Sequence, residues 1–401
     1  MEKLDKIEII NQLSMRYDPR KKSDFYKNNW KSYNNQNSDP DGLTTEKMLI
    51  NNIKNSLFSS KGRVSISLSS GIDSALCLSL FRKIFPSRKI TALTASFEGG
   101  DESKKASEIA RKYDADFKTI PIESIFKNMP ELVMITKKPK WNTYQHIIAK
   151  ESRKYSKFLI TGDGADEIFG GYVFRYNKFL NLTRSNDTTL KKIKNYLECH
   201  NRDWVPDQKN LFDKNLNFSW NKIFLYFEKY FSNSLPLLKQ VMYADLNGKL
   251  YHDFQPNGQR IFSKYDLIGV QPFLNSKIID FGIKLPIEEL YDKKTGLGKL
   301  VLRKISKRMA VNHIDEKRGF SLNLLIDWKK NGKDICQEFL LDKNSHIYSE
   351  KIINFNWVKK AFNIVENDGN LIYLSRLISI LALEVWFRIQ FNELKPSQTL
   401  V

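Results

Sequence analysis

The hydrophobic positions of residues 43–161 follow two alternating spacings, one typical of strands and one typical of helices. Short apolar runs rich in β-branched residues predict strands at residues 64–68, 90–97, 117–122 and 157–161. Segments with apolar residues three or four positions apart predict helices at residues 44–57, 74–84, 102–113 and 143–155. Because strands that alternate with helices build parallel β-α-β units, the pattern predicts an α/β fold with a doubly wound, mostly parallel sheet.

The rest of the 401-residue chain divides around this core, and its length fits two or three domains. Residues 1–42 are polar and rich in Asn, Lys and Tyr, so we expect an irregular N-terminal extension before a core at residues 43–180. Helical periodicity dominates residues 181–401 and predicts a largely helical C-terminal part. The longest apolar stretch, residues 371–387, contains Arg376 and Glu384, and therefore predicts a buried helix rather than a membrane span.

Composition narrows the class of protein only slightly. No apolar segment follows the first residues and the three cysteines lie far apart, so we expect a cytoplasmic protein without a signal peptide or disulfide framework. The net charge of +20 fits a lysine-rich solvated surface, and it also fits a polyanionic partner such as tRNA, an acidic glycan or an acidic peptide. Basic clusters are not interleaved with aromatic residues, and no nucleic-acid-binding module is recognisable.

The strongest chemical signal is the segment Leu-Ser-Ser-Gly-Ile-Asp-Ser at residues 68–74, between a predicted strand and a predicted helix. Small residues let backbone N–H groups approach an anion, and the N-terminus of the following helix adds a positive dipole. The hydroxyls of Ser69, Ser70 and Ser74 can donate to phosphate oxygens. Asp73 is itself anionic, so its expected role is to hold a Mg²⁺ ion that bridges the phosphates.

A second glycine-rich segment, residues 161–172, follows the fourth predicted strand and reads Thr-Gly-Asp-Gly-Ala-Asp-Glu-Ile-Phe-Gly-Gly-Tyr. Its three acids, Asp163, Asp166 and Glu167, repel one another unless a cation or a proton relieves the repulsion. Ligands of parallel sheets bind beyond the carboxyl ends of the strands. Both segments follow strands, so we expect them to meet at that edge.

Together these segments resemble the asparagine synthetase family of the N-type ATP pyrophosphatase, or PP-loop, superfamily. The superfamily loop reads S-G-G-x-D-S, with Ser70 here in place of the first glycine, and the second family segment reads S-G-[ED]-G-x-D-E-x-F-G-G-Y. Weaker matches follow in the family's order and extend the resemblance over roughly residues 45–390, at residues 271–275, 285–286, 298–303, 316–320, 328 and 384–386. The resemblance implies the adenine-nucleotide α-hydrolase type of sheet.

Three departures from the family bear on the substrate. The family begins with a glutaminase domain whose nucleophile is a cysteine after the initiator methionine, whereas this sequence has Glu2. We therefore expect ammonia, an amine or a separate amidotransferase subunit to supply the nitrogen. Residues 268–275 lack the glutamate and arginine of the family's E-x-R-x-P-F-L-D, and Asp315 replaces an arginine near its K-x-G-F segment. Aspartate as the carboxylate substrate is therefore open.

The resemblance implies that a carboxylate attacks the α-phosphorus of ATP, and that an amine then displaces AMP from the acyl-adenylate. It assigns Mg²⁺ to Asp73 and Asp166, deprotonation of the amine to Asp163, and a phosphate contact to Lys317. The expected ATP and pyrophosphate contacts are Leu68, Ser69, Ser70, Gly71, Asp73, Ser74, Phe97, Thr161 and Gly162. Further candidates are Lys299 and Arg303 near phosphate, Arg260 near the acceptor, and Glu167 beside Asp163.

Four functions remain open from the sequence. The first is an asparagine-synthetase-like ligase, and the second is a ligase that amidates another carboxylate, such as a sugar acid, or closes a lactam. A PP-loop enzyme that modifies tRNA is the third; the net charge favours it, and the lack of paired cysteines counts against its sulfur-transferring members. The fourth, a non-catalytic binding module, is disfavoured because Asp73, Asp163, Asp166 and Lys317 are all present.

Overall fold

Five parallel strands form a sheet in the order β3-β2-β1-β4-β5. The computed structural model describes residues 5–21, 28–34, 36–98, 102–311 and 324–401. The strands are β1 (Val64–Ser67), β2 (Ile90–Ser96), β3 (Asp116–Pro121), β4 (Phe158–Ile160) and β5 (Ile268–Val270). Successive strands run outward from β1 to one edge and then from β4 to the other. The order therefore reverses between β1 and β4, which is where doubly wound sheets bind ligands.

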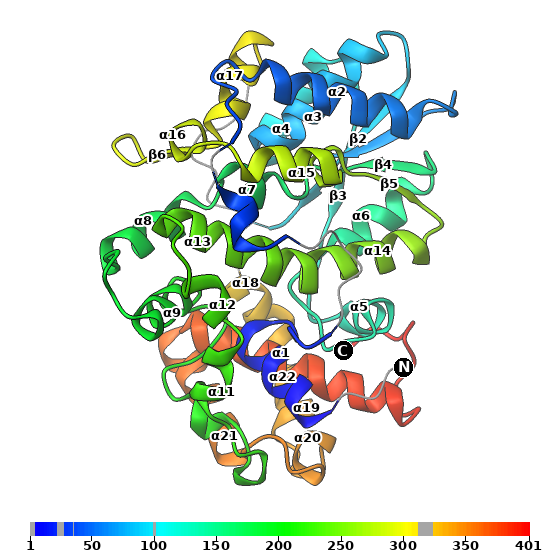
Figure 1. The fold of residues 1–401 in the computed structure, drawn as a ribbon. Coiled ribbons are helices and arrows are strands. Elements are labelled where there is room, and N and C mark those ends of the chain that lie inside the picture. Colours follow the sequence, from blue (N-terminus) through cyan, green and yellow to red (C-terminus); the bar gives the residue numbers. More distant parts are fainter. Residues whose placement is uncertain (1–4, 22–27, 35, 99–101, 312–323) are drawn as a thin grey trace.

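Helices cover both faces of this sheet (Figure 1). One face carries α2 (Leu43–Leu57), α3 (Ile72–Ile84) and α4 (Glu102–Lys112), and the other carries α6 (Gln145–Ser152) and α14 (Gln255–Lys264). The central strands β1 and β2 are buried almost throughout, as expected for a parallel sheet covered on both sides. The predicted α/β class and doubly wound sheet are thus confirmed.

Two helices begin and end close to the residues that the sequence predicts. Apolar residues of α2 at three- and four-residue spacing, among them Leu49, Ile53 and Leu57, are fully buried. The apolar stretch at 371–387 forms α22 (Leu371–Gln390), and it is buried over most of its length. In the part of the chain that the structure describes, no helix is long and apolar enough to cross a membrane.

Two ordered elements lie outside the predicted core at residues 43–180. Residues 1–42 were expected to be irregular, but they include α1 (Lys6–Met15), which Asp5 caps by accepting from the Glu8 N–H and which buries Ile9 and Leu13 beside α22. The sheet also extends beyond the predicted core at 43–180, because β5 comes from the C-terminal part and pairs with β4. A three-residue strand is too short to show a periodicity in the sequence.

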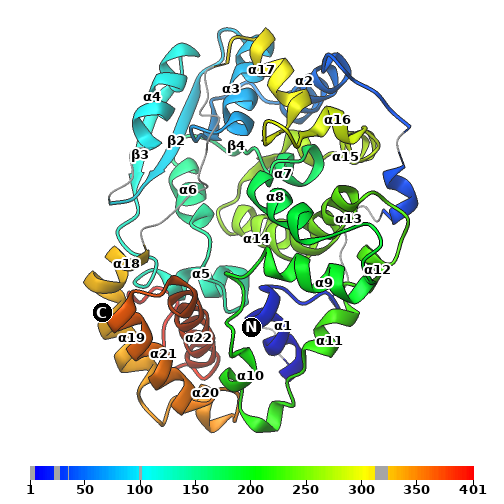
Figure 2. The same cartoon turned by 90° about the vertical axis from the view of Figure 1, so that its left-hand side faces the viewer.

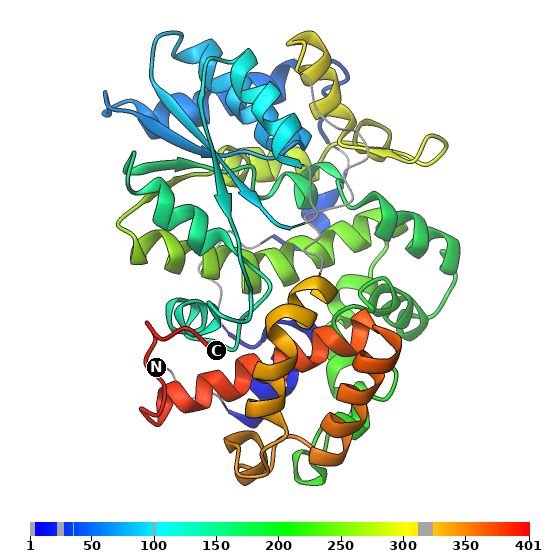
Figure 3. The same ribbon diagram turned by 180° about the vertical axis from the view of Figure 1, so that it is seen from behind.

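The C-terminal part is largely helical, as expected, and surrounds a second hydrophobic core centred on α22 (Figures 2 and 3). A continuous helical stretch separates this core from the sheet; it comprises α13 (Leu237–Ala244), the π-helical η3 (Asp245–Phe254) and α14. The other elements are η1 (Trp30–Tyr33), α5 (Met129–Thr136), α7 (Ala165–Phe169), α8 (Val173–Leu182), α9 (Thr189–Glu198), α10 (Gln208–Leu211), η2 (Lys214–Leu216), α11 (Trp220–Leu225), α12 (Glu228–Phe231), η4 (Pro272–Leu274), α15 (Ser276–Ile283), α16 (Ile287–Leu290), β6 (Tyr291–Asp292), β7 (Leu297–Gly298), α17 (Leu300–Arg308), α18 (Leu324–Asp327), η5 (Trp328–Gly332), α19 (Lys333–Leu340), α20 (His346–Ser349) and α21 (Phe355–Asp368).

A buried lysine on α13 gives the fold a pH-dependent stability. The Lys239 ammonium donates to the backbone oxygens of Ile283, at 2.8 Å, and Leu285, at 2.5 Å. Burial lowers the pKa of Lys239 to about 7. Between that value and the ordinary lysine pKa of 10.5, the unfolded chain binds more protons than the folded chain. The free energy of unfolding therefore rises with pH, by at most about 1.4 kcal/mol per pH unit.

Lys239→Met should remove this pH dependence. Urea unfolding of the wild type between pH 7 and pH 9 is expected to show stability rising with pH, whereas the variant should lack this contribution. The matched control is Lys307→Met, because Lys307 is exposed on α17 and should leave the wild-type slope unchanged. Parallel pH profiles for the wild type and Lys239→Met would contradict the prediction.

Candidate active site

A cavity opens where the strand order reverses, beyond the carboxyl ends of β1 and β4. Both predicted loops line it: the loop at 68–74 through Leu68, Ser69, Asp73 and Ser74, and the loop at 161–172 through Thr161, Gly162, Asp163, Gly164, Asp166, Glu167 and Tyr172. Tyr144 and Gln145 contribute from the start of α6, and Phe254 contributes from the end of η3. The cavity therefore lies between the sheet and the helical stretch of α13, η3 and α14.

The first loop is held by hydrogen bonds among its own residues. The Ser69 N–H donates to the Ser74 hydroxyl at 3.0 Å, and the Gly71 N–H donates to the Ser69 hydroxyl at 3.3 Å. The hydroxyl of Ser70 is buried and has no hydrogen-bond partner within the described residues. The next helix, α3, begins at Ile72 without a side-chain cap, so N–H groups of its first turn remain available to an anion.

In the second loop, three side chains hold Asp163. The Thr161 hydroxyl donates to Asp163 Oδ2 at 2.7 Å, Gln271 Nε2 donates to the same oxygen at 3.1 Å, and Gln145 Nε2 donates to Oδ1 at 3.3 Å. Burial raises the pKa of Asp163 above its ordinary value, although these hydrogen bonds oppose the shift, and the charge of Asp166 adds to it. Burial is therefore a larger cause of this shift than repulsion from the neighbouring acid.

The two loops meet at a single lysine. The Lys299 ammonium lies 2.6 Å from Asp73 Oδ2 in the first loop and 2.6 Å from Asp166 Oδ1 in the second. Burial opposes the charge of Lys299, but the two carboxylates outweigh burial and raise the pKa of Lys299 above its ordinary value. Lys299 is therefore a cation at neutral pH, and Asp73 and Asp166 face the same point.

Two glycines permit this close approach. A Cβ atom at Gly162 would lie 2.8 Å from the Cβ of Asp73 and 3.2 Å from the Ser74 nitrogen, so a larger residue would push the loops apart. A Cβ at Gly171 would lie 1.8 Å from Asp166 Oδ1 and 2.3 Å from Lys299 Cε. The glycines of the motifs thus serve the packing of Lys299 between the carboxylates.

Glu167 differs from its neighbour Asp166 in its surroundings. Its carboxyl group is buried and accepts a hydrogen bond from the Tyr172 hydroxyl. Burial, together with the charge of Asp166, raises the pKa of Glu167 to about 8. A raised pKa lets Glu167 hold a proton more readily, which reduces the repulsion among the three acids, and the Lys299 ammonium offsets the charge of Asp166.

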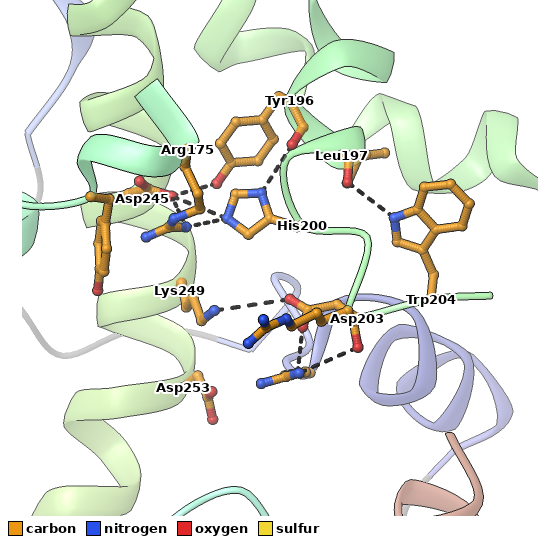
Figure 4. A network of polar contacts seen from close by, with 12 residues as sticks. Arg175, Tyr196, Leu197, His200, Asp203, Trp204, Asp245, Lys249 and Asp253 are labelled. Carbon is orange, nitrogen blue, oxygen red and sulfur yellow. Dashed lines mark hydrogen bonds and ion pairs between the residues drawn. The ribbon is translucent and has the colours of Figure 1, made fainter. Parts of the chain in front are cut away.

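A buried polar network supports the Tyr172 ring from behind. The guanidinium of Arg175 lies 3.5 Å from the centre of that ring and 3.2 Å from Asp245 Oδ1. The Tyr196 hydroxyl donates to the same Asp245 oxygen at 2.8 Å. Figure 4 shows Arg175, Tyr196 and His200 converging on Asp245. Because Asp245 is the first residue of η3, the network anchors the second loop to the helical stretch of α13, η3 and α14.

The remaining predicted residues have different positions. Phe97, just after β2, packs its ring edge-on against Tyr144 at a centroid distance of 5.2 Å, and Tyr144 lines the cavity. Arg303 donates to the Gly298 backbone oxygen at 2.8 Å. Arg260 donates to the backbone oxygen of Thr136 at the end of α5 and does not line the cavity. Lys317 and Asp315 lie outside the described residues.

The arrangement can be tested for its fit to Mg²⁺. Among the described residues, no group of three or more His, Cys, Asp or Glu side chains could hold a metal ion. Mg²⁺ is usually bound by one or two carboxylates together with water and substrate phosphates. Asp73 and Asp166 provide two carboxylates that already share one cation, the Lys299 ammonium. These two residues therefore fit a Mg²⁺ ion that arrives with a nucleotide.

Comparisons with known proteins identify the family of the chain. A model of the asparagine synthase family matches residues 45–388. The glutamine-hydrolyzing asparagine synthetase 1 of Bacillus subtilis (strain 168) is 25% identical over 323 residues, which cover 70% of this chain and 50% of that protein. The chain thus spans about half the length of this curated relative. A solved structure, the U34-tRNA thiolase NcsA from Methanococcus maripaludis with its 4Fe-4S cluster, is 14% identical and has a TM-score of 0.25; the match covers 55% of this chain and 78% of that one.

Proposed function

The chain belongs to the asparagine synthase family, and we propose from this membership and the cavity that it is an ATP-dependent ligase that releases AMP and pyrophosphate while joining a carboxylate to ammonia or an amine. One observation carries the proposal. Asp73 and Asp166, from the two motif loops, converge on one cation beside a helix N-terminus. This combination suits a nucleoside triphosphate, because the cation and the helix N-terminus can both neutralise phosphate charge.

In the proposed first step, a carboxylate oxygen of the substrate attacks the α-phosphorus of ATP. A bond forms between that oxygen and phosphorus, and the bond to the pyrophosphate oxygen breaks. The first turn of α3 and the Ser70 hydroxyl would bind the leaving pyrophosphate. Mg²⁺ held by Asp73 and Asp166 would supply charge neutralisation on the phosphates. With a nucleotide present, the Lys299 ammonium would remain close enough to bind a phosphate oxygen.

In the proposed second step, an amine nitrogen attacks the carbonyl carbon of the acyl-adenylate, AMP leaves, and the nitrogen loses a proton. Asp163 would accept that proton at its carboxylate. Its raised pKa makes it a better base than an exposed aspartate. Gln145, Gln271 and Thr161 would keep its oxygens oriented. For Lys317, which lies outside the described residues, a phosphate contact remains part of the proposal.

The acceptor is proposed to be a carboxylate other than aspartate. Beside Asp163, β5 presents Ile268, Gly269 and Val270 in the segment where the resembled family carries glutamate and arginine. Without that arginine and glutamate, the segment offers no cation for the second carboxylate of aspartate and no anion for its ammonium group. The neutral side chain nearest to Asp163 from this segment is Gln271.

The proposal is tested by incubating the purified chain with ATP, Mg²⁺ and ammonium and measuring pyrophosphate release. A panel of carboxylates, including aspartate, sugar acids and acidic peptides, is compared with total tRNA. We expect release that depends on one class of carboxylate, with an amide as the product. Release with tRNA alone would contradict the proposal and favour a tRNA-modifying enzyme. If no acceptor in the panel supports release, amide formation is contradicted.

A further inference from the structure

A second cleft lies beside the cavity, at the outer edge of the sheet. It is bordered by α2, by the junction of η3 and α14, by β5 and by the start of α15. None of the described residues that line it is charged. Most of them carry amides or hydroxyls, among them Asn52, Asn55, Ser56, Gln255, Gln259 and Gln271.

Two of these amides are held by the protein, because Asn52 donates to the Pro272 oxygen and Gln271 donates to Asp163. Gln255 is only 5% exposed and lines the cleft from the start of α14. The exposed residues Asn55 and Gln259 line the same cleft. An amide carries both a donor and an acceptor, so the Gln255 side chain is suited to a ligand that offers both as well.

The backbone of β5 adds to the same surface. The Ile268 N–H donates to the Lys157 oxygen at 2.7 Å, and the Val270 oxygen accepts from the Thr161 N–H at 3.0 Å. In a parallel ladder, the residue between two such positions directs its N–H and C=O to the opposite side. Gly269 therefore presents a donor and an acceptor at the free edge of the outermost strand, and it lines the cleft.

The cleft and the cavity share a wall. Gln271 follows β5, lines the cleft and donates to Asp163, which lines the cavity. Leu274 also lines the cleft, and a Cβ at Gly164 in the second loop would lie 2.3 Å from it. A molecule lying along β5 would thus point toward Asp163.

We propose that this cleft binds an extended peptide segment of the substrate, paired with the edge of β5, and that one end of the peptide reaches Asp163. An extended peptide repeats a donor and an acceptor along its main chain, which matches both the free edge at Gly269 and the neutral amides around it. A lining without charges offers no ion pair to a phosphate or a free amino acid. The inference deepens the proposed function, on which it rests, by assigning a peptide as the substrate class.

The test uses the full chain and a fluorescein-labelled random decapeptide library with free C-terminal carboxylates. Fluorescence anisotropy measures its binding beside a matched library in which the main-chain amides are N-methylated. We expect methylation to weaken binding by about tenfold or more, because it removes the donors that pair with β5. The double variant Asn55→Ala/Gln259→Ala should weaken binding of the unmethylated library by a similar factor. Asn51→Ala, on the exposed surface of α2 outside the cleft lining, should leave it unchanged.

Three outcomes would overturn the inference. Equal binding of the two libraries, or no binding of either, would exclude a main-chain interaction, and competition by neutral oligosaccharides in place of peptide would make the ligand a polyol. Pyrophosphate release with small carboxylates is measured on the same proteins. If that release persists while the peptide libraries fail to bind, only the cleft assignment is wrong; if no carboxylate supports release, the proposed function is wrong.

Discussion

Replacing either Asp73 or Asp166 with asparagine should lower ATP-dependent pyrophosphate release by about a thousandfold, with the protein still folded. Each substitution removes one of the two carboxylates that converge on Lys299 and, in the proposed function, on Mg²⁺. An amide has nearly the same shape as a carboxylate but carries no charge to hold the ion. Initial rates at saturating ATP and Mg²⁺ measure the effect, and circular dichroism confirms the fold.

The matched control for these variants is Asp114→Asn, because the Asp114 side chain is fully exposed at a turn remote from the cavity lining. It should keep wild-type turnover. Excess Mg²⁺ or Mn²⁺ should recover part of the activity of the two loop variants if they lose metal affinity. Near-normal turnover in either loop variant would show that the assignment of the metal to these carboxylates is wrong.

Replacing Lys299 with methionine should destabilise the protein in the absence of divalent cations by about 2 kcal/mol, because two carboxylates would face each other without a cation. Breaking a fully buried ion pair costs roughly 3–5 kcal/mol, and the expected value is smaller since the Asp166 side chain is partly exposed. Lys307→Met on α17 is the control and should change stability little. Urea unfolding in EDTA gives the comparison.

Added Mg²⁺ should then stabilise Lys299→Met more than the wild type. In the wild type the ammonium already occupies the point between Asp73 and Asp166, so the ion must compete with it. In the variant that competitor is gone. A Mg²⁺ titration of the melting temperature, without nucleotide, separates the two cases. An equal response of both proteins to Mg²⁺ would mean that the two carboxylates do not form a joint cation site.

The sequence predicts the two loops well because their chemistry is local. Each consists of a strand end, small residues and acids within a few positions, and parallel pairing brings the ends of β1 and β4 to one edge. The sequence could not show that Lys299 pairs with Asp73 and Asp166, because that contact depends on the packing of a segment 226 residues away from Asp73. Gln145 and Gln271 carry no signal of their own, since neutral amides occur at any polar position.

The fold outside the core was harder to predict for two physical reasons. In α1, the Asp5 cap and the spacing of Ile9 and Leu13 were readable, but the polar composition of the surrounding residues suggested an irregular segment. In β5, only three residues pair with the sheet, and no periodicity exists over so short a run. Because β5 pairs with β4, it places Gln271 against Asp163. A strand that the sequence does not predict therefore positions a site residue that the sequence does not predict either.

The most direct test of the account is to identify the products of ATP by phosphorus NMR. The wild-type chain is incubated with ATP, Mg²⁺, ammonium and the carboxylate that best supports turnover. If the two loops hold the triphosphate as proposed, ATP is cleaved between its α and β phosphorus atoms, and AMP and pyrophosphate form in equal amounts. Formation of ADP and inorganic phosphate would contradict the account.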